Sequence, residues 1–134
     1  MEKRQQAVAR ECLDGAYDNV IGFPESVERL IEAGFDGYHV DYRANTRIYY
    51  LPDGETLVLR NPHDHGALAP AFDGAAIAAA VGWARLSPPG YNYADFNRKV
   101  IAGGCAGYMV SLAGRRVLYY GRSAETHVER FPDR

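Results

Sequence analysis

The chain has 134 residues, of which 47% are hydrophobic and 24% charged, and its formal net charge is −2. This size and composition are typical of one globular domain and argue against a disordered chain. The 15 basic residues are mixed with 17 acidic ones. Proteins that bind phosphate backbones usually carry a basic excess, so nucleic acid is not the expected partner.

The beginning of the chain is charged and lacks the apolar core of a secretory signal, and no stretch approaches the length of a membrane span. Cys12 and Cys105 stand alone, a pattern typical of reduced and buried thiols. No glycine-rich phosphate loop or nucleophile motif is present. We therefore expect a cytoplasmic protein without a membrane contact and without a cofactor.

The first half of the chain predicts two helices followed by three strands. Amphipathic spacing favours a helix over residues 3–17 and a second one over residues 24–34, which ends on a glycine. Three alternating segments follow, separated by turns at Asn45 and at residues 52–54. The expected strands are GYHVDYR (37–43), TRIYYL (46–51) and ETLVLR (55–60).

The second half predicts the same order of elements after a proline-containing linker, residues 61–72. Asp73 is the expected N-cap of an alanine-rich helix over residues 75–86, and a fourth helix is expected over residues 93–102. Two strands and a last extended stretch complete the chain. They are GYMVSL (107–112), RRVLYYG (115–121) and ETHVERF (125–131).

An internal repeat appears when the chain is aligned with itself at an offset of 70 residues. Between residues 30–60 and 100–130 this alignment gives eleven identities, where chance would give about two. The matched residues are Ile31, Gly34, Gly37, Tyr38, Val40, Tyr49, Tyr50, Glu55, Thr56, Val58 and Arg60, each with its counterpart 70 positions later.

The repeat predicts one α+β domain over residues 1–134, made of a duplicated helix–helix–β–β–β unit. The pseudo-repeats cover about residues 1–60 and 73–131. We expect antiparallel sheet with the helices packed on one face, and the two copies meeting either edge to edge or face to face. The pseudo-twofold axis relating them is an expected place for a ligand or for self-association.

Four segments resemble the YbcV/YdfO-like family of small bacterial, often prophage-borne proteins of unknown function, some of which are labelled phage envelope proteins. These segments are AGFDGYHVDY, TRIYYLPDGET, AGGCAGYMV and GRRVLYYGRSAETHVERFP. The resemblance covers about residues 23–132 and implies a compact α+β fold in a bacterial or phage-linked setting. It brings no established activity or catalytic residue, and the lack of a membrane segment argues against a literal envelope protein.

Two histidines have a carboxylate two positions further along the same predicted strand. His39 precedes Asp41, and His127 precedes Glu129, so each pair shares one face of its strand. Neither histidine is duplicated at the offset of 70 residues, as expected where a site was specialised in one copy or lost from the other. A histidine beside a carboxylate can act as a general base, whereas the alternative is a solvated sheet face with ordinary charge pairs.

Further polar and aromatic residues are candidates for ligand contacts. Arginine binds anions through a planar fork, and the candidates for an anionic ligand are Arg43, Arg115 and Arg116. Most tyrosines are expected to have structural roles. The alternative is an exposed aromatic surface for a ligand or partner, with Tyr50 and Tyr120 as its candidates.

The linker contains an H-x-H pair, His63 and His65, which could supply two ligands to a transition metal. A closed site needs further ligands, and the neighbouring sequence offers only Asp64. A polar loop without a metal is therefore the expected role of this segment.

These observations favour a non-catalytic binding or interaction module, with a homodimer as one expected form and its small-molecule ligand unspecified. Its expected working surface is a strand face bearing His39, Asp41, His127 and Glu129. The alternative is a small hydrolase-type enzyme that uses one histidine–carboxylate pair of that surface. An enzyme requires such a pair to be hydrogen-bonded and to open into a concave pocket.

Overall fold

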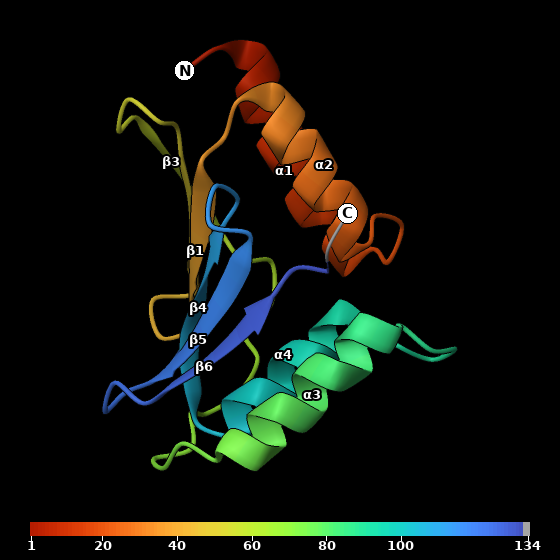
Figure 1. Ribbon diagram of the computed structural model, residues 1–134, viewed down its shortest axis with the longest axis vertical. Helices are drawn as coiled ribbons and strands as arrows, with labels where there is room; N and C mark the ends of the chain where they lie inside the picture. The colour runs from red at the N-terminus through yellow and green to blue at the C-terminus, as the bar shows by residue number, and fades with distance from the viewer. Residues whose placement is uncertain (133–134) are drawn as a thin grey trace.

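The computed structural model describes residues 1–132, in which four helices cover one face of a six-stranded sheet (Figure 1). The helices are α1 (Lys3–Tyr17), α2 (Phe23–Ala33), α3 (Gly74–Leu86) and α4 (Tyr93–Ala102). The strands are β1 (Gly37–Asp41), β2 (Thr46–Tyr50), β3 (Thr56–Arg60), β4 (Cys105–Ser111), β5 (Arg116–Gly121) and β6 (Thr126–Arg130). The predicted α+β class is confirmed.

All six strands belong to one antiparallel sheet with the order β3-β2-β1-β4-β5-β6. The two three-stranded meanders therefore meet edge to edge, through β1 and β4. Gly37 pairs with Ser111, His39 with Met109, and Asp41 with Gly107. At the offset of 70 residues the first and last of these pairs are each other's counterparts. Exchanging the two halves therefore leaves the register of this pairing unchanged. The pseudo-twofold axis that relates them passes between His39 and Met109.

The turns also correspond between the halves. Left-handed backbone occurs at three pairs of positions separated by 70 residues, namely Gly34 and Gly104, Asn45 and Arg115, and Gly54 and Ala124. Non-glycine residues adopt this conformation only at an energetic cost. The same local path is therefore retained in both halves, although the residues at two of the pairs differ. Gene duplication as the origin of this correspondence stays a prediction.

The element boundaries agree closely with the sequence, and the first strand shows why one of them differs. The strand ends at Asp41 instead of Arg43, because the Asp41 carboxylate accepts hydrogen bonds from the backbone N–H groups of Arg43 and Ala44. This side-chain contact favours a turn over continued strand. Residues 61–72 contain no helix or strand, as predicted.

The core lies between the sheet and the helices and is rich in tyrosine. Tyr38, Tyr49, Tyr108 and Tyr119 point to the helix side and are at most 6% exposed. Both cysteines are free and buried, and burial raises the pKa of Cys105 to about 11. Cys105 is therefore a packed thiol, as predicted. Within the described residues, no helix has the length and apolar content needed to cross a bilayer.

Candidate ligand-binding site

The four helices form two pairs, α1 with α2 and α3 with α4, which stand apart over the same face of the sheet (Figure 1). A cavity of about 890 Å³ lies between them. Small-molecule sites commonly have volumes of roughly 300–1,000 Å³. Its floor is formed by strand residues Tyr38, Arg47, Tyr108, Val117, Tyr119 and Glu129. Its walls include helix and loop residues Phe23, Val27, Val81, Ala84, Tyr91 and Phe96.

Arg47 is the most unusual residue of this floor. Strand alternation puts it on the helix side of β2 together with Tyr49, and it is only 3% exposed. Its guanidinium carbon lies 5.1 Å from the centre of the Tyr38 ring and 5.5 Å from that of Tyr93. One Nη donates to the Tyr93 hydroxyl, which is also hydrogen-bonded to the Tyr108 hydroxyl.

No acidic side chain of residues 1–132 forms an ion pair with Arg47, and its Nε is buried without an acceptor. Burial acts to lower the pKa of Arg47, but the surrounding tyrosines, Tyr93 foremost, raise it well above its usual value. The guanidinium is thus a permanent positive charge in the core. A buried charge without an ionic partner costs free energy, so Arg47 is a candidate anchor for an anionic group.

A second charged group of the floor is already paired. The Glu129 carboxylate lies 3.1 Å from an Nη of Arg85 on α3. Burial raises the pKa of Glu129, while Arg85 and His127 act to lower it. Arg115 also lines the cavity, where its guanidinium donates to the Pro132 carbonyl at 3.0 Å and lies over the Phe131 ring.

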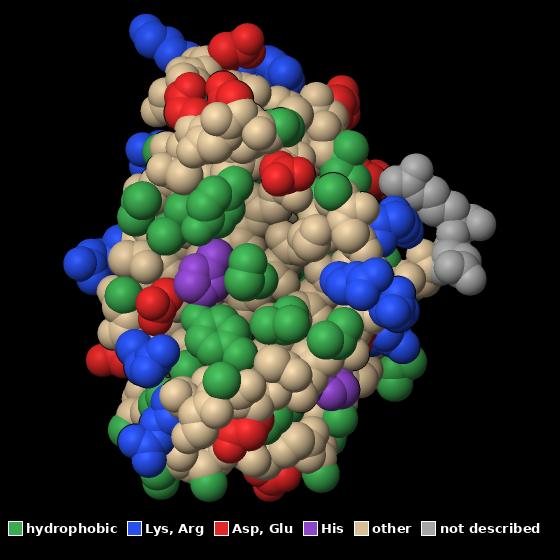
Figure 2. Space-filling model, turned by 60° about the vertical axis from the view of Figure 1, so that its left-hand side comes forward, with side chains coloured by type: hydrophobic (Ala, Val, Ile, Leu, Met, Phe, Trp, Pro, Cys, Tyr) green, Lys and Arg blue, Asp and Glu red, His purple; other side chains and the backbone are tan. Residues whose placement is uncertain are grey.

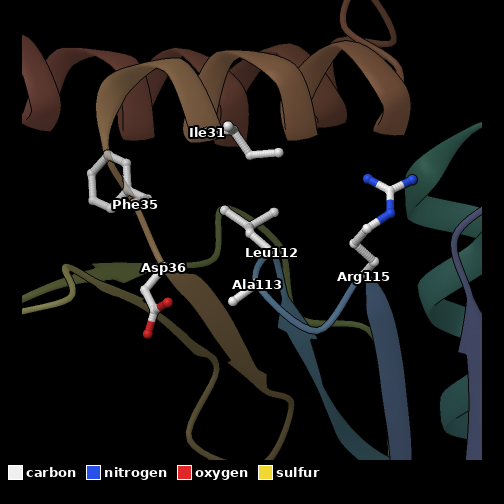
Figure 3. Close-up of a pocket in the computed structure, with 6 residues that line it drawn as sticks. All are labelled: Ile31, Phe35, Asp36, Leu112, Ala113 and Arg115. Carbon is white, nitrogen blue, oxygen red and sulfur yellow. The ribbon is translucent and has the colours of Figure 1, made fainter. Parts of the chain in front are cut away.

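A smaller hollow of about 480 Å³ adjoins the cavity at the edge of α2. Figure 3 shows Ile31 pointing from α2 toward Leu112, with the Arg115 side chain rising beside them. Ile31 and Arg115 line both spaces. The remaining charged residue of the hollow, Asp36, is exposed, so the hollow lacks a buried charged anchor of the kind that Arg47 provides.

His39 and Asp41 lie on the other face of the sheet, which no helix of the described chain covers (Figures 1 and 2). The His39 ring is hydrogen-bonded to the Tyr120 hydroxyl, with 2.6 Å between Nε2 and Oη, and not to Asp41. Gly107 makes room for this contact. A Cβ there would come within 2.8 Å of Tyr120 Cζ.

His127 and Glu129 lie on the helix side, so the prediction that they share one surface with His39 and Asp41 is wrong. The register pairs His127 with Tyr119, whereas His39 lies in the same cross-strand row as Met109 and Leu118. Adjacent residues of a strand point to opposite faces. Sequence spacing within each strand was sufficient to group each pair, but only the register between strands decides whether two pairs meet.

The other predicted contact residues are divided between the two sides. Tyr50 and Arg116 lie on the open face with Tyr120, because they pair with Gly37 and Ser111, which are two residues from His39 and Met109 on their strands. Arg43 lies in the exposed turn after β1. Of the predicted contact residues and carboxylates, Arg115 and Glu129 line the large cavity.

The prediction of a simple polar loop at residues 63–65 is wrong for His65, which is 7% exposed. Its Nε2 lies 2.9 Å from the Tyr17 hydroxyl and 3.2 Å from Nδ2 of Asn97. Burial lowers the pKa of His65. His63 packs on the Tyr17 ring at 5.2 Å. Residues 1–132 contain no group of three or more His, Cys, Asp or Glu side chains placed to hold a metal ion.

The sequence analysis missed Arg47, although two signals point to it. Alternation in TRIYYL places Arg47 on the face of Tyr49, and its counterpart 70 positions later is Val117, which is 2% exposed. A charged residue at a position where the other half buries valine is a candidate for a specific role. The same comparison sets Glu129 against the buried Leu59.

No family model matches the chain, and a search of curated proteins finds no match. The resemblance to the YbcV/YdfO-like family therefore stays a prediction, and the site is interpreted from its own geometry.

Proposed function

We propose that the protein is a non-catalytic binding module that takes a small organic molecule into the cavity between its two helix pairs. The observation that carries this proposal is the 890 Å³ cavity, whose floor holds the buried Arg47, without an acidic partner among residues 1–132. Ligand sites in proteins typically combine apolar and aromatic walls with a few polar groups, and this cavity has both. A bacterial or prophage setting is part of the proposal and rests on the family resemblance alone.

The enzyme alternative has weaker support from the geometry. His39 is bonded to a tyrosine hydroxyl on the open sheet face, outside the cavity. The His127 ring makes no hydrogen bond within residues 1–132, and its nearest aromatic neighbour is Tyr119 at 6.1 Å. The hydrolase mechanism expected from the sequence needs a histidine oriented by a carboxylate, and neither histidine is arranged in that way.

Filling the cavity tests the proposal. Ala84 of α3 lines the cavity, whereas Ala78 on the same helix is exposed and lies outside it. We expect Ala84→Trp to weaken binding of 2-naphthamide, a neutral bicyclic probe, by roughly 10-fold or more, because the indole occupies the space that the probe needs. Ala78→Trp is the matched control and should bind like the wild type in saturation-transfer NMR. Absence of binding to the wild type, or equal binding to both variants, contradicts the proposal.

We also propose that the open face of the sheet mediates self-association with a second copy of the chain. One cross-strand row on this face runs through all six strands and contains the exposed Val58, Met109 and Val128, which are 57%, 49% and 44% exposed. Figure 2 shows hydrophobic side chains grouped on this side of the molecule. The row consists of counterpart positions from the two halves, with valine at both ends, and it is apolar apart from His39. In a symmetric dimer the same patch of each copy meets its own mate, and an apolar row can pack against itself in this way.

Light scattering after size exclusion tests this second proposal. Met109 occupies the middle of the row, and Val20, which is 72% exposed, lies away from it in the loop after α1. Met109→Glu should convert a dimer to a monomer, because a carboxylate would be buried against its own symmetry mate. Val20→Glu should leave the dimer intact. A monomeric wild type at all concentrations overturns the proposal.

A further inference from the structure

We infer that the ligand of the cavity carries one carboxylate group, which pairs with Arg47, on an aromatic or apolar body. This inference rests on the proposed binding function and specifies its ligand class. It starts from Arg47, which is only 3% exposed. This arginine lines the cavity and has no acidic partner among residues 1–132. A carboxylate matches the planar guanidinium fork and would neutralise it.

The charge balance of the cavity favours a single negative charge on the ligand. Within the described part of the chain no carboxylate pairs with the deep charge at Arg47, whereas Arg85 is paired with Glu129. Two further carboxylates, Glu28 and Glu32, line the cavity from α2. Arg115 also lines the cavity, but it is only half-buried and donates to the Pro132 carbonyl. A dianion such as a phosphate monoester would therefore face these three acidic groups with Arg47 as the one deeply buried cation that has no acidic partner among residues 1–132. A carboxylate monoanion balances Arg47 and leaves the Arg85–Glu129 pair in place.

Tyrosine hydroxyls complete the anion site. Tyr93 and Tyr108 form a hydrogen-bonded chain that begins at Arg47. Burial raises the pKa of Tyr108 far above its usual value, so its hydroxyl keeps its proton and remains a donor at physiological pH. A carboxylate oxygen can accept from such a hydroxyl while it pairs with the guanidinium.

The rings around Arg47 define the body of the ligand. Tyr38 and Tyr93 flank the guanidinium, and Phe96 stacks on Tyr93 at 6.1 Å between ring centres. All of these side chains line the cavity. Tyr91 also lines it and packs edge-to-face against Trp83. Aromatic walls favour aromatic or apolar ligand surfaces through burial and edge-to-face contacts. The combination of such walls with one buried cation is suited to an aromatic or fatty carboxylic acid.

Calorimetric titration of three matched probes tests the inference, namely 2-naphthoate, its neutral isostere 2-naphthamide, and the dianion 2-naphthyl phosphate. The wild type should bind the carboxylate at least roughly 10-fold more tightly than the amide, as expected for a charge-assisted hydrogen bond, and more tightly than the phosphate. Arg47→Met should abolish this preference, because it weakens carboxylate binding far more than amide binding, which loses only a hydrogen bond to a neutral carbonyl. Arg116→Met removes an arginine of the open face and should change neither.

The outcomes separate the inference from the proposed function. Equal binding of acid and amide overturns the inference and leaves the binding function standing, whereas binding of none of the probes overturns both. Tightest binding of the phosphate overturns the monoanion assignment, and a preference that survives in Arg47→Met shows that another residue is the anchor. Arg47→Lys, which retains the charge without the fork, should retain part of the preference and serves if the methionine variant does not fold.

Discussion

Residues 23–60 and 93–130 follow the same backbone plan, yet they place polar side chains at different buried positions. Arg47 of the first half corresponds to Val117 of the second, and the second half has Asn97 where the first has Val27. All four side chains are buried on the helix side of the sheet. The apolar member of each pair shows that the fold itself does not require a polar group there. The polar members therefore indicate which positions serve a local network or a ligand.

The largest expected difference between counterparts concerns two glycines with left-handed backbone. A Cβ at Gly104 would come within 2.6 Å of the Ala71 carbonyl carbon, whereas at Gly34 the nearest atom is the flexible Gln5 side chain at 3.5 Å. We expect Gly104→Ala to lower the free energy of unfolding by about 3–4 kcal/mol, from backbone strain plus overpacking. Gly34→Ala should lower it by about 1–2 kcal/mol, from strain alone.

Urea unfolding of both glycine variants measures this difference. Equal losses would mean that the linker segment at Ala71 moves freely and does not press on the second half. The hydrogen bond from Asp73 N–H to the Gly103 carbonyl argues that the segment is held in place.

Asn97 provides the second comparison, because its counterpart is Val27. Its side chain accepts from the Tyr42 hydroxyl and donates to Tyr17, and its Nδ2 lies 3.2 Å from the His65 ring. Asn97→Val copies the other half but leaves these groups without a partner. We expect a loss of about 2–3 kcal/mol in the free energy of unfolding, from buried unpaired polar atoms.

The reverse change, Val27→Asn, is the control for Asn97→Val. It tests whether polarity at this position is tolerated only where the tyrosine and histidine partners exist. A tolerated Val27→Asn together with a neutral Asn97→Val would show that the network contributes nothing.

Arg47→Met is expected to change stability in the opposite direction. Replacing a buried cation that has no acidic partner among residues 1–132 by an apolar side chain of similar length should raise the free energy of unfolding of the ligand-free protein by about 1 kcal/mol or more. Such a gain, combined with loss of carboxylate preference, would identify Arg47 as a residue kept for binding at a cost in stability. Thermal unfolding in the absence of ligand measures it. A strong destabilisation would instead indicate that Arg47 holds Tyr93 and Tyr38 in place.

Most of the backbone could be predicted from the sequence because its signals are local. The helix of residues 3–17 and the helix of residues 93–102 follow from apolar spacing and caps, and they agree with α1 and α4. The edge-to-edge joining of β1 and β4 could not be predicted, since alternation within a strand does not identify its neighbour.

The candidate site was harder to predict than the fold, for the same reason. His39 and His127 attracted attention by residue type, but cross-strand register places them on opposite faces. Arg47 was overlooked because a strand arginine is ordinarily solvated. Only the comparison with Val117, or the structure itself, shows that this arginine is buried.

The smallest expected effect is the pH dependence of the free energy of unfolding that comes from His39. Replacing His39 by methionine, the residue at the counterpart position, should remove it. Burial lowers the pKa of His39, with Asp41 opposing the shift, and the counterpart of His39 is Met109, which does not titrate. A histidine whose pKa is lowered in the folded state binds fewer protons there than in the unfolded chain. Its contribution is therefore complete above the unfolded pKa of about 6.5 and is lost as the pH falls below that value.

Urea midpoints at about pH 7.5 and about pH 5.5 measure this loss. His39→Met should reduce the decrease between the two pH values by less than about 1 kcal/mol, since the ring is only partly buried. His65→Gln should act in the same direction through the buried His65. Glu129 acts oppositely, because its raised pKa makes protonation favour the folded state over a pH window that extends upward from the unfolded glutamate pKa of about 4.3. An undiminished decrease in the His39 and His65 double variant would assign the pH dependence to other groups.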